Sequence, residues 1–289
     1  IVLFNLICII NFKIMKTIDC ITYCGEDLLL KIRFETLYDK IDKFIIVEAN
    51  KYFNGENKEK LFNHKNFEKY LDKLEYYYIE DLPEYNGNNI EYEIFIKNQI
   101  SRGLNNLNDD DIILISDVDE IPNLKNDKFK SYDSAVFLQK MFYYKFNINA
   151  YEGLKFKNKI ACTKSCKFKY FKSFQQVREF RVKNIPWWRF DKTIKRYIEP
   201  NGGWHFSYLM KSKDIKLKLS RFEHEIKHLK KGEKYDLKKL MDIKNIENNI
   251  SQLKDPYGRE HVKLKKINID ESFPEYIYQN QDDLRDFIV

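Results

Sequence analysis

Two aspartates and a glutamate follow an apolar run in DDDIILISDVDEIPN, residues 109–123, and their spacing suits metal and phosphate chemistry. On an extended segment Asp117 and Asp119 point to the same side, and the turn at Pro122 can bring both carboxylates toward one point. Two unpartnered carboxylates repel each other, and a divalent cation removes that conflict. Mg²⁺ and Mn²⁺ take oxygen ligands and leave room for phosphate oxygens and water. The pair therefore predicts a metal site for a nucleotide diphosphate, and the alternative is a solvated acidic turn.

The elements before this stretch place it at the end of a strand. Apolar runs predict strands over 17–23, 43–50, 74–80 and 111–116, and helical spacing predicts helices over 25–41, 66–74 and 90–107. Strands that alternate with helices and are apolar throughout predict an α/β fold with a mostly parallel central sheet flanked by helices. In such sheets, ligands lie beyond the carboxyl ends of the strands, which is where SDVDEIP falls.

The second half of the chain has a different pattern. It predicts a strand over 135–147, shorter aromatic strands as far as residue 188, a strand in GGWHFSYL (202–209) and a Lys-rich helical region over 212–249. The chain has no internal repeat and no linker rich in Pro, Gly or Ser. We therefore expect a single composite domain over residues 16–289.

Composition limits the class of partner. The net charge of +7 comes from Lys residues interleaved with Asp and Glu, which argues against a continuous track for nucleic acid. The five cysteines form no CxxC pair, and we expect mostly buried, free thiols.

Residues 1–15 form an apolar leader whose origin stays open. IVLFNLICIINFKI precedes Met15 and is shorter than the roughly 20 residues that span a bilayer. Three interpretations stay open: the segment lies upstream of a true translation start at Met15, it is the remnant of a membrane anchor or signal segment, or it is an extra strand or helix. Membrane association is expected only if residues 1–14 are an anchor remnant, so a cytoplasmic and an ER- or Golgi-type location both stay open.

Four strings together resemble glycosyltransferase family 17: IDCITYCGEDLLLKIR, FIIVEAN, DDDIILISDVDEIP and GGWHFSYL. They occur in the family's order from about Asp19 to Glu225, with fainter agreement near Phe273 and Pro274. The family contains the enzyme that adds the bisecting β-1,4-linked N-acetylglucosamine to the core mannose of N-glycans. The resemblance implies a Rossmann-like glycosyltransferase fold of the GT-A type, with residues 16–122 as the nucleotide-sugar half and 123–289 as the acceptor-side half. It also implies an inverting enzyme with Mn²⁺ or Mg²⁺, a UDP-sugar donor (most simply UDP-N-acetylglucosamine) and a glycan or glycoprotein acceptor.

The resemblance also implies roles for the acidic residues. Asp117 and Asp119 would be the Asp-x-Asp pair, one bound directly to the metal and the other through water or ribose. Glu120 would complete the motif and orient the sugar. His205, in GWHFSY, would be a third metal ligand, and the alternative is a histidine satisfied in the core.

Five further residues are predicted to contact the nucleotide. Glu26 and Arg33 match the family's early motif, although Arg33 could equally pair with a carboxylate in the sheet. Glu48 ends the second strand, where such folds hold base or ribose. Asn98 and Arg102 are four apart on one helix face and would reach the diphosphate, unless they are plain surface residues.

An inverting transferase also needs a general base to take the proton of the acceptor hydroxyl. Glu179 and Asp191 lie between the Asp-x-Asp pair and His205, and Glu225 lies in the helical region that follows. The sequence leaves these three carboxylates as alternatives.

Two other functions stay open. Another metal-dependent, nucleotide-using transferase would be expected to carry a glycine-rich phosphate loop, and no such string occurs among only 9 glycines. A non-catalytic carbohydrate-binding module would have no need for the three acidic residues together.

Overall fold

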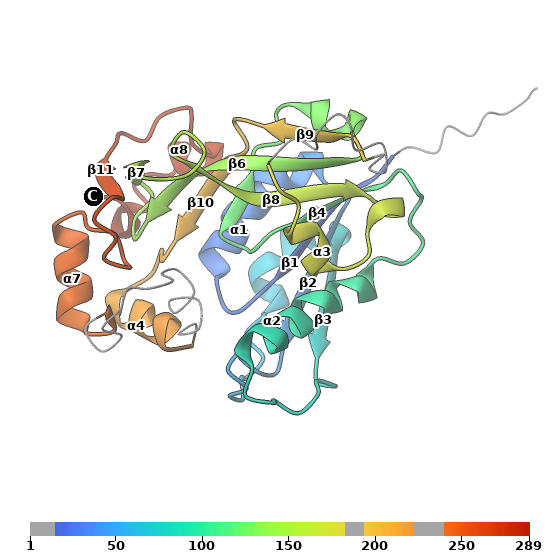
Figure 1. Ribbon diagram of the computed structural model, residues 1–289, viewed down its shortest axis with the longest axis horizontal. Helices are drawn as coiled ribbons and strands as arrows, with labels where there is room; N and C mark the ends of the chain where they lie inside the picture. The colour runs from blue at the N-terminus through green and yellow to red at the C-terminus, as the bar shows by residue number, and fades with distance from the viewer. Residues whose placement is uncertain (1–14, 183–193, 222–239) are drawn as a thin grey trace, which may run out of the picture.

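The computed structural model describes residues 15–182, 194–221 and 240–289, and these form one mixed sheet with helices on both faces (Figure 1). The main path of the sheet runs β11-β7-β6-β8-β4-β1-β2-β3; β10 pairs with β5 and β6, and β9 pairs with β6. The strands are β1 (Thr17–Thr22), β2 (Lys43–Ala49), β3 (Leu74–Ile79), β4 (Ile112–Ile115), β5 (Glu120–Pro122), β6 (Ser134–Tyr143), β7 (Ile148–Glu152), β8 (Lys159–Lys167), β9 (Arg196–Glu199), β10 (Gly203–Ser207) and β11 (Lys263–Lys266).

The first half of the sheet agrees with the sequence. β1 pairs in parallel with β2 and β4, and β2 pairs in parallel with β3. Each predicted helix is present, but the last turns are 3₁₀. The segments are α1 (Asp27–Leu37) with η1 (Tyr38–Lys40), the 3₁₀ helix η2 (His64–Lys73), and α2 (Asn89–Asn98) with η3 (Gln99–Gly103). The carboxyl ends of β1, β2 and β4 therefore meet at one edge of the sheet.

The expectation of a mostly parallel, Rossmann-like sheet of the GT-A type is wrong. The fold is α/β, but β8 is antiparallel to both β4 and β6, and antiparallel pairs also join β6 to β7, β7 to β11 and β5 to β10. For β6 and β7 the reason lies in their connection: residues 144–147 form a short loop, whereas a parallel pair needs a crossover of about a dozen residues or more. The run of aromatic strands without intervening helices was the sequence signal for antiparallel pairing.

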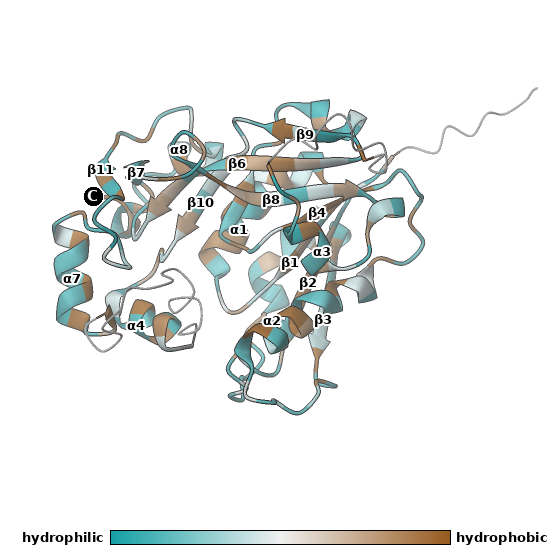
Figure 2. Cartoon of the chain, viewed as in Figure 1, coloured by the Kyte–Doolittle hydropathy of each residue, from teal (hydrophilic) through white to brown (hydrophobic). Residues whose placement is uncertain are grey.

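The remaining helices complete the layers. They are α3 (Phe174–Arg178), α4 (Ser212–Arg221), α7 (Ile243–Ser251) and α8 (Glu275–Gln279), with short 3₁₀ turns at η4 (Asp127–Ser131), η5 (Phe168–Tyr170) and η6 (Arg285–Phe287). α1 and α8 pack on one face of the sheet, α2 and α3 pack on the other, and α4 and α7 cover the ends of β6, β7 and β11. Figure 2 shows the apolar stretches of β6 and β10 in brown and much of α7 in teal.

The described cysteines agree with the sequence, since Cys20, Cys24, Cys162 and Cys166 are all free and only Cys24 is partly exposed. Cys8 lies outside the described residues. Within the ranges that the structure covers, none of the helices has the length and apolar run that crossing a membrane requires.

Gly203 fixes the approach of β10 to β5. Its φ is +118°, and a Cβ atom added there would lie 2.1 Å from the carbonyl oxygen of Ile121. We expect Gly203→Ala to lower the free energy of unfolding by about 1–3 kcal/mol, because it combines an unfavourable φ with a backbone clash. Denaturant unfolding of both proteins measures this difference.

Gly87→Ala is the matched control. Gly87 also has a positive φ, +85°, but an added Cβ would meet nothing within 4 Å. An equal loss of stability in the two variants would show that the clash with β5 contributes nothing.

Candidate functional site

The acidic stretch turns sharply between β4 and β5, at the carboxyl end of the parallel strands. Antiparallel pairing of β5 with β10 sets His205 opposite Glu120, and the Phe206 amide donates to the carbonyl oxygen of Asp119 at 2.9 Å. His205 therefore reaches the acidic turn from β10, in the second half of the chain. Its role as a ligand stays a prediction.

Arg33 binds the backbone of the acidic turn. Its guanidinium is buried and binds both carboxylate oxygens of Asp19, at 2.6 and 2.7 Å. Its Nη1 donates to the carbonyl oxygens of Asp117 at 3.1 Å and Glu120 at 2.9 Å, while Nη2 donates to Ser116 Oγ at 2.5 Å. Arg33 thus pairs with a carboxylate in the sheet, the alternative that the sequence left open, and it shapes the acidic turn.

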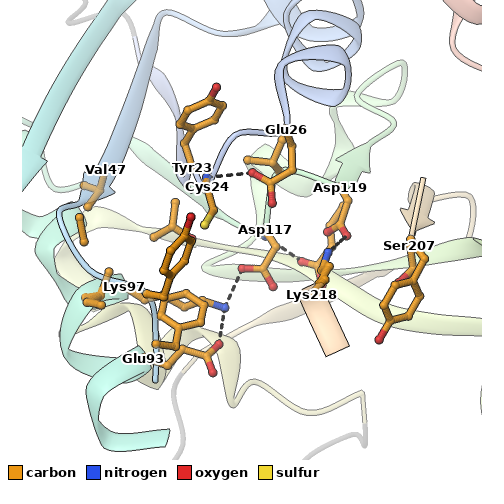
Figure 3. Close-up of a pocket in the computed structure, with 18 of the residues that line it drawn as sticks. Tyr23, Cys24, Glu26, Val47, Glu93, Lys97, Asp117, Asp119, Ser207 and Lys218 are labelled. Carbon is orange, nitrogen blue, oxygen red and sulfur yellow. Dashed lines mark hydrogen bonds and ion pairs between the residues drawn. The ribbon is translucent and has the colours of Figure 1, made fainter. Parts of the chain in front are cut away.

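Asp117 lies between two cationic side chains. Its Oδ1 is 2.8 Å from Lys97 Nζ, which is also 2.7 Å from Glu93 Oε1, and its Oδ2 is 3.4 Å from Arg178 Nη2 (Figure 3). Burial raises the pKa of Asp117, but the attraction of Lys97 and Arg178 outweighs burial and brings the pKa below its usual value. Asp117 is therefore ionised at neutral pH.

Asp119 lies beside a second pair of basic side chains. Its Oδ2 lies 3.5 Å from His205 Nε2 and 3.5 Å from Lys218 Nζ on α4. Burial opposes ionisation, yet His205 and Lys218 together hold the pKa of Asp119 well below its usual range. Burial likewise lowers the pKa of His205, but the carboxylate of Asp119 more than compensates, so the net shift of that pKa is upward.

Glu120 is the most deeply buried of the three acids and is held by Arg178. Its Oε2 accepts from Arg178 Nη1 at 2.5 Å and its Oε1 accepts from Nη2 at 3.0 Å, a bidentate pair. Oε2 also accepts from the Asp117 amide at 3.1 Å. This pair fixes Arg178 beside Asp117, and the proposed role of Glu120 in orienting the sugar stays a prediction.

These groups line a cavity of about 290 Å³ at the carboxyl ends of β1, β2 and β4. Asp117, Asp119 and Lys97 line it, together with Tyr52 and Tyr208. A second cavity of about 460 Å³ adjoins it, and the two share Cys24, Glu26, Tyr52 and Lys218. The site is thus a pair of adjoining cavities, both lined in part by charged side chains.

Glu26 is the predicted nucleotide contact that the structure does place at the cavity. It lies at the N-terminal end of α1, and its Oε2 accepts from the Cys24 amide at 2.8 Å (Figure 3). Burial raises the pKa of Glu26 above its usual value, despite the attraction of Lys218.

The other predicted contacts lie away from the cavity wall. Glu48 is buried and accepts from the Leu61 and Phe62 amides at 2.7 and 3.0 Å, so it anchors the loop that follows β2. Arg102 is exposed and pairs with Asp81 at 2.6 Å, and Asn98 accepts from the Gln175 amide at 3.4 Å.

Of the three predicted bases, the structure describes Glu179 alone. Glu179 is exposed, accepts from Gln175 Nε2 at 3.0 Å and is not among the residues that line the cavity. Asp191 and Glu225 lie outside the described residues.

The sequence missed the cationic half of the site, which comprises Lys97, Arg178 and Lys218. Each comes from a different helix, and a basic residue on an amphipathic helix is usually solvated. Only Lys97 had a local signal, because Glu93 precedes it by four residues on α2. Arg178, which precedes the predicted base Glu179, contacts Asp117 and Glu120.

A further group has the chemistry of a metal site. One ligand atom from each of Glu120, Cys162 and His205 lies within 4.8 Å of the others. Burial raises the pKa of the Cys162 thiol well above its usual value, and Glu120 already binds Arg178 in bidentate fashion. Among the described residues, Asp119 and His205 are therefore a better-suited pair for a divalent transition-metal ion such as Mn²⁺.

Comparison with known proteins gives one result that covers nearly the whole chain. The sequence profile of glycosyltransferase family 17 matches residues 10–282. No curated protein matches the chain. The matched region contains the acidic turn and every residue that holds it.

Proposed function

This chain belongs to glycosyltransferase family 17 and is a glycosyltransferase, and from that premise we propose a specific reaction for it. The reaction is transfer of N-acetylglucosamine from UDP-N-acetylglucosamine to a hydroxyl of a glycan, with inversion and with the help of a divalent cation. The supporting observation is that Asp117 and Asp119, each between two cationic groups, face one cavity at the carboxyl ends of the parallel strands.

The residues present fit a divalent cation. Asp119 Oδ2 and His205 Nε2 lie 3.5 Å apart at the cavity wall. A carboxylate oxygen suits Mn²⁺ or Mg²⁺, and an imidazole nitrogen beside it favours a transition metal such as Mn²⁺ over Mg²⁺. These two side chains would hold the ion, and Asp117 would do so through water. The ion would supply charge neutralisation for the diphosphate of the donor.

Basic side chains of the protein would also help to bind the diphosphate of the donor. Lys97 and Arg178 both contact Asp117, and Lys218 approaches Asp119. They would attract the diphosphate and stabilise the charge that grows on it as the bond to the sugar breaks. Because the carboxylates already hold these side chains in place, little reorganisation would be needed when the donor binds.

The direct test is thermal unfolding of the purified chain with UDP-N-acetylglucosamine and Mn²⁺. Donor at about 100 times its Kd should stabilise the fold by about 2.7 kcal/mol, because the donor binds only the folded chain. For a chain of this size that corresponds to a rise in Tm of several degrees, at roughly 2–4 °C per kcal/mol.

Chelator and other nucleotides provide the controls. EDTA should remove most of the rise in Tm if the ion bridges protein and diphosphate. GDP-mannose should leave the Tm unchanged, and UDP alone should give part of the rise. An unchanged Tm with every nucleotide, with and without Mn²⁺, would contradict the proposed donor.

A further inference from the structure

Glu26 lies at the boundary of the two cavities. It lines the first cavity, which holds the acidic turn, and also the second, which extends between the start of α1 and α4. In a single displacement the base must touch the acceptor hydroxyl while that oxygen faces the anomeric carbon of the donor. A side chain shared by two adjoining cavities meets this geometric requirement.

The second cavity has the mixed lining that a sugar requires. Asp27, Lys211 and Asp214 provide polar groups at its wall, and Leu209, Leu217 and Phe287 provide apolar surface. Sugar rings present hydroxyls on their edges and C–H groups on their faces, so they match such a lining. At about 460 Å³ this cavity is larger than the first, which suits part of an oligosaccharide.

The other carboxylates at the first cavity are already engaged by cations. Asp117, Asp119 and Glu120 pair with Lys97, His205 and Arg178 as described above, and Glu93 also pairs with Lys97. A carboxylate held by a basic side chain is a weak proton acceptor. The side chain of Glu26 accepts one bond at Oε2 from the Cys24 amide, which fixes its orientation. Among the described residues, Glu26 forms no ion pair within 4.0 Å, unlike the other four acids.

We propose that the second cavity binds the acceptor glycan and that Glu26 is the general base of the transfer; this rests on the function proposed above. The acceptor hydroxyl gives its proton to the Glu26 carboxylate as its oxygen forms the bond to the anomeric carbon. The bond from that carbon to the diphosphate oxygen breaks, and its electron pair leaves with UDP. The raised pKa of Glu26 increases its affinity for the proton it receives.

The first test is Glu26→Gln, assayed with UDP-N-acetylglucosamine and a free N-glycan that contains the core mannose. Gln keeps the size and the bond from the Cys24 amide but cannot take a proton. We expect kcat to fall by about 10²–10⁴-fold. The Kd for UDP-N-acetylglucosamine, measured by calorimetry, should stay that of the wild-type chain. Glu68→Gln, at an exposed glutamate outside both cavities, is the matched control and should keep wild-type kcat.

The second test blocks the acceptor cavity. Leu217 lines it and is 46% exposed, so Leu217→Trp should fill space there and raise KM for the glycan while the donor Kd is unchanged. Leu71→Trp is the matched control, since Leu71 is 39% exposed and lies on η2, outside the lining of both cavities.

The outcomes separate this inference from the function on which it rests. A wild-type chain that does not bind UDP-N-acetylglucosamine overturns the proposed function, and the base assignment falls with it. A wild-type chain that binds the donor and glycosylates the glycan, with Glu26→Gln equally active, overturns only the assignment of Glu26. Loss of donor binding in Glu26→Gln also overturns it, because Glu26 would then be a nucleotide contact.

Discussion

Asp119→Asn is expected to lower kcat/KM for transfer by at least about 10²–10³-fold, the loss typical of a removed electrostatic contact in an active site. Asn keeps the shape of the side chain but removes the negative charge that faces both His205 and Lys218. Lys218 and a protonated His205 would then lose the anion that lies beside both of them, and a divalent cation would lose its carboxylate ligand. The Mn²⁺ concentration needed for half-maximal activity should therefore rise as well.

The fold should survive this change. The turn is held through its backbone, by the Phe206 amide on Asp119 and by Arg33 on the neighbouring carbonyls. Circular dichroism and the denaturation midpoint of Asp119→Asn should therefore remain close to those of the wild-type chain.

Asp110→Asn is the control from the same acidic stretch. Asp110 is exposed, precedes β4, and pairs with Lys167 and Lys169 at 3.0 and 2.9 Å, away from the cavity. Its removal should leave transfer unchanged. Equal activity of Asp119→Asn and the wild-type chain would contradict both the metal role and the electrostatic role of Asp119.

The acidic half of this site was predictable from local sequence, and the cationic half was not. Asp117 and Asp119 directly follow an apolar strand, so a short stretch of sequence contains both the strand and the acidic residues of the site. Lys97, Arg178 and Lys218 reach the same cavity because α2, α3 and α4 pack around the sheet. A short stretch of sequence around each residue does not show how these helices pack. A lysine on a helix surface and a lysine bound to a buried carboxylate look the same in sequence.

For the fold too, pairing between strands close in sequence was predictable, and pairing between distant segments was not. Strands β1 to β4 alternate with helices, and their parallel pairing follows from that alternation. The insertion of β8 between β4 and β6, and the pairing of β5 with β10, join segments far apart in the chain. The error of a mostly parallel sheet came from extending the pattern of the first half past residue 123, where β6 and β7 follow each other with no helix between them and a loop, residues 144–147, that is too short for a parallel crossover.

Arg33→Met should be the most destabilising single change at this site. Arg33 and Asp19 are both 0% exposed, and without the guanidinium the Asp19 carboxylate would be buried without its partner. Removing one member of a buried ion pair costs about 3–5 kcal/mol, so we expect the free energy of unfolding to fall by that amount. The carbonyl oxygens of Asp117 and Glu120 would also lose their donor, so transfer should be lost even where the variant remains folded.

A double variant separates these two effects. With Asp19→Leu added to Arg33→Met, no unpaired charge is buried, and much of the lost stability should return. Transfer should remain low, because neither new side chain can donate to the backbone of the acidic turn. Arg102→Met, at an exposed ion pair with Asp81, controls for removal of an arginine and should change neither property. If the double variant were no more stable than Arg33→Met, an unpaired Asp19 could not be the source of the loss. If it regained full activity, the hydrogen bonds from Arg33 to the turn would be dispensable, and the cations of the cavity would suffice to hold Asp117 and Asp119 in place.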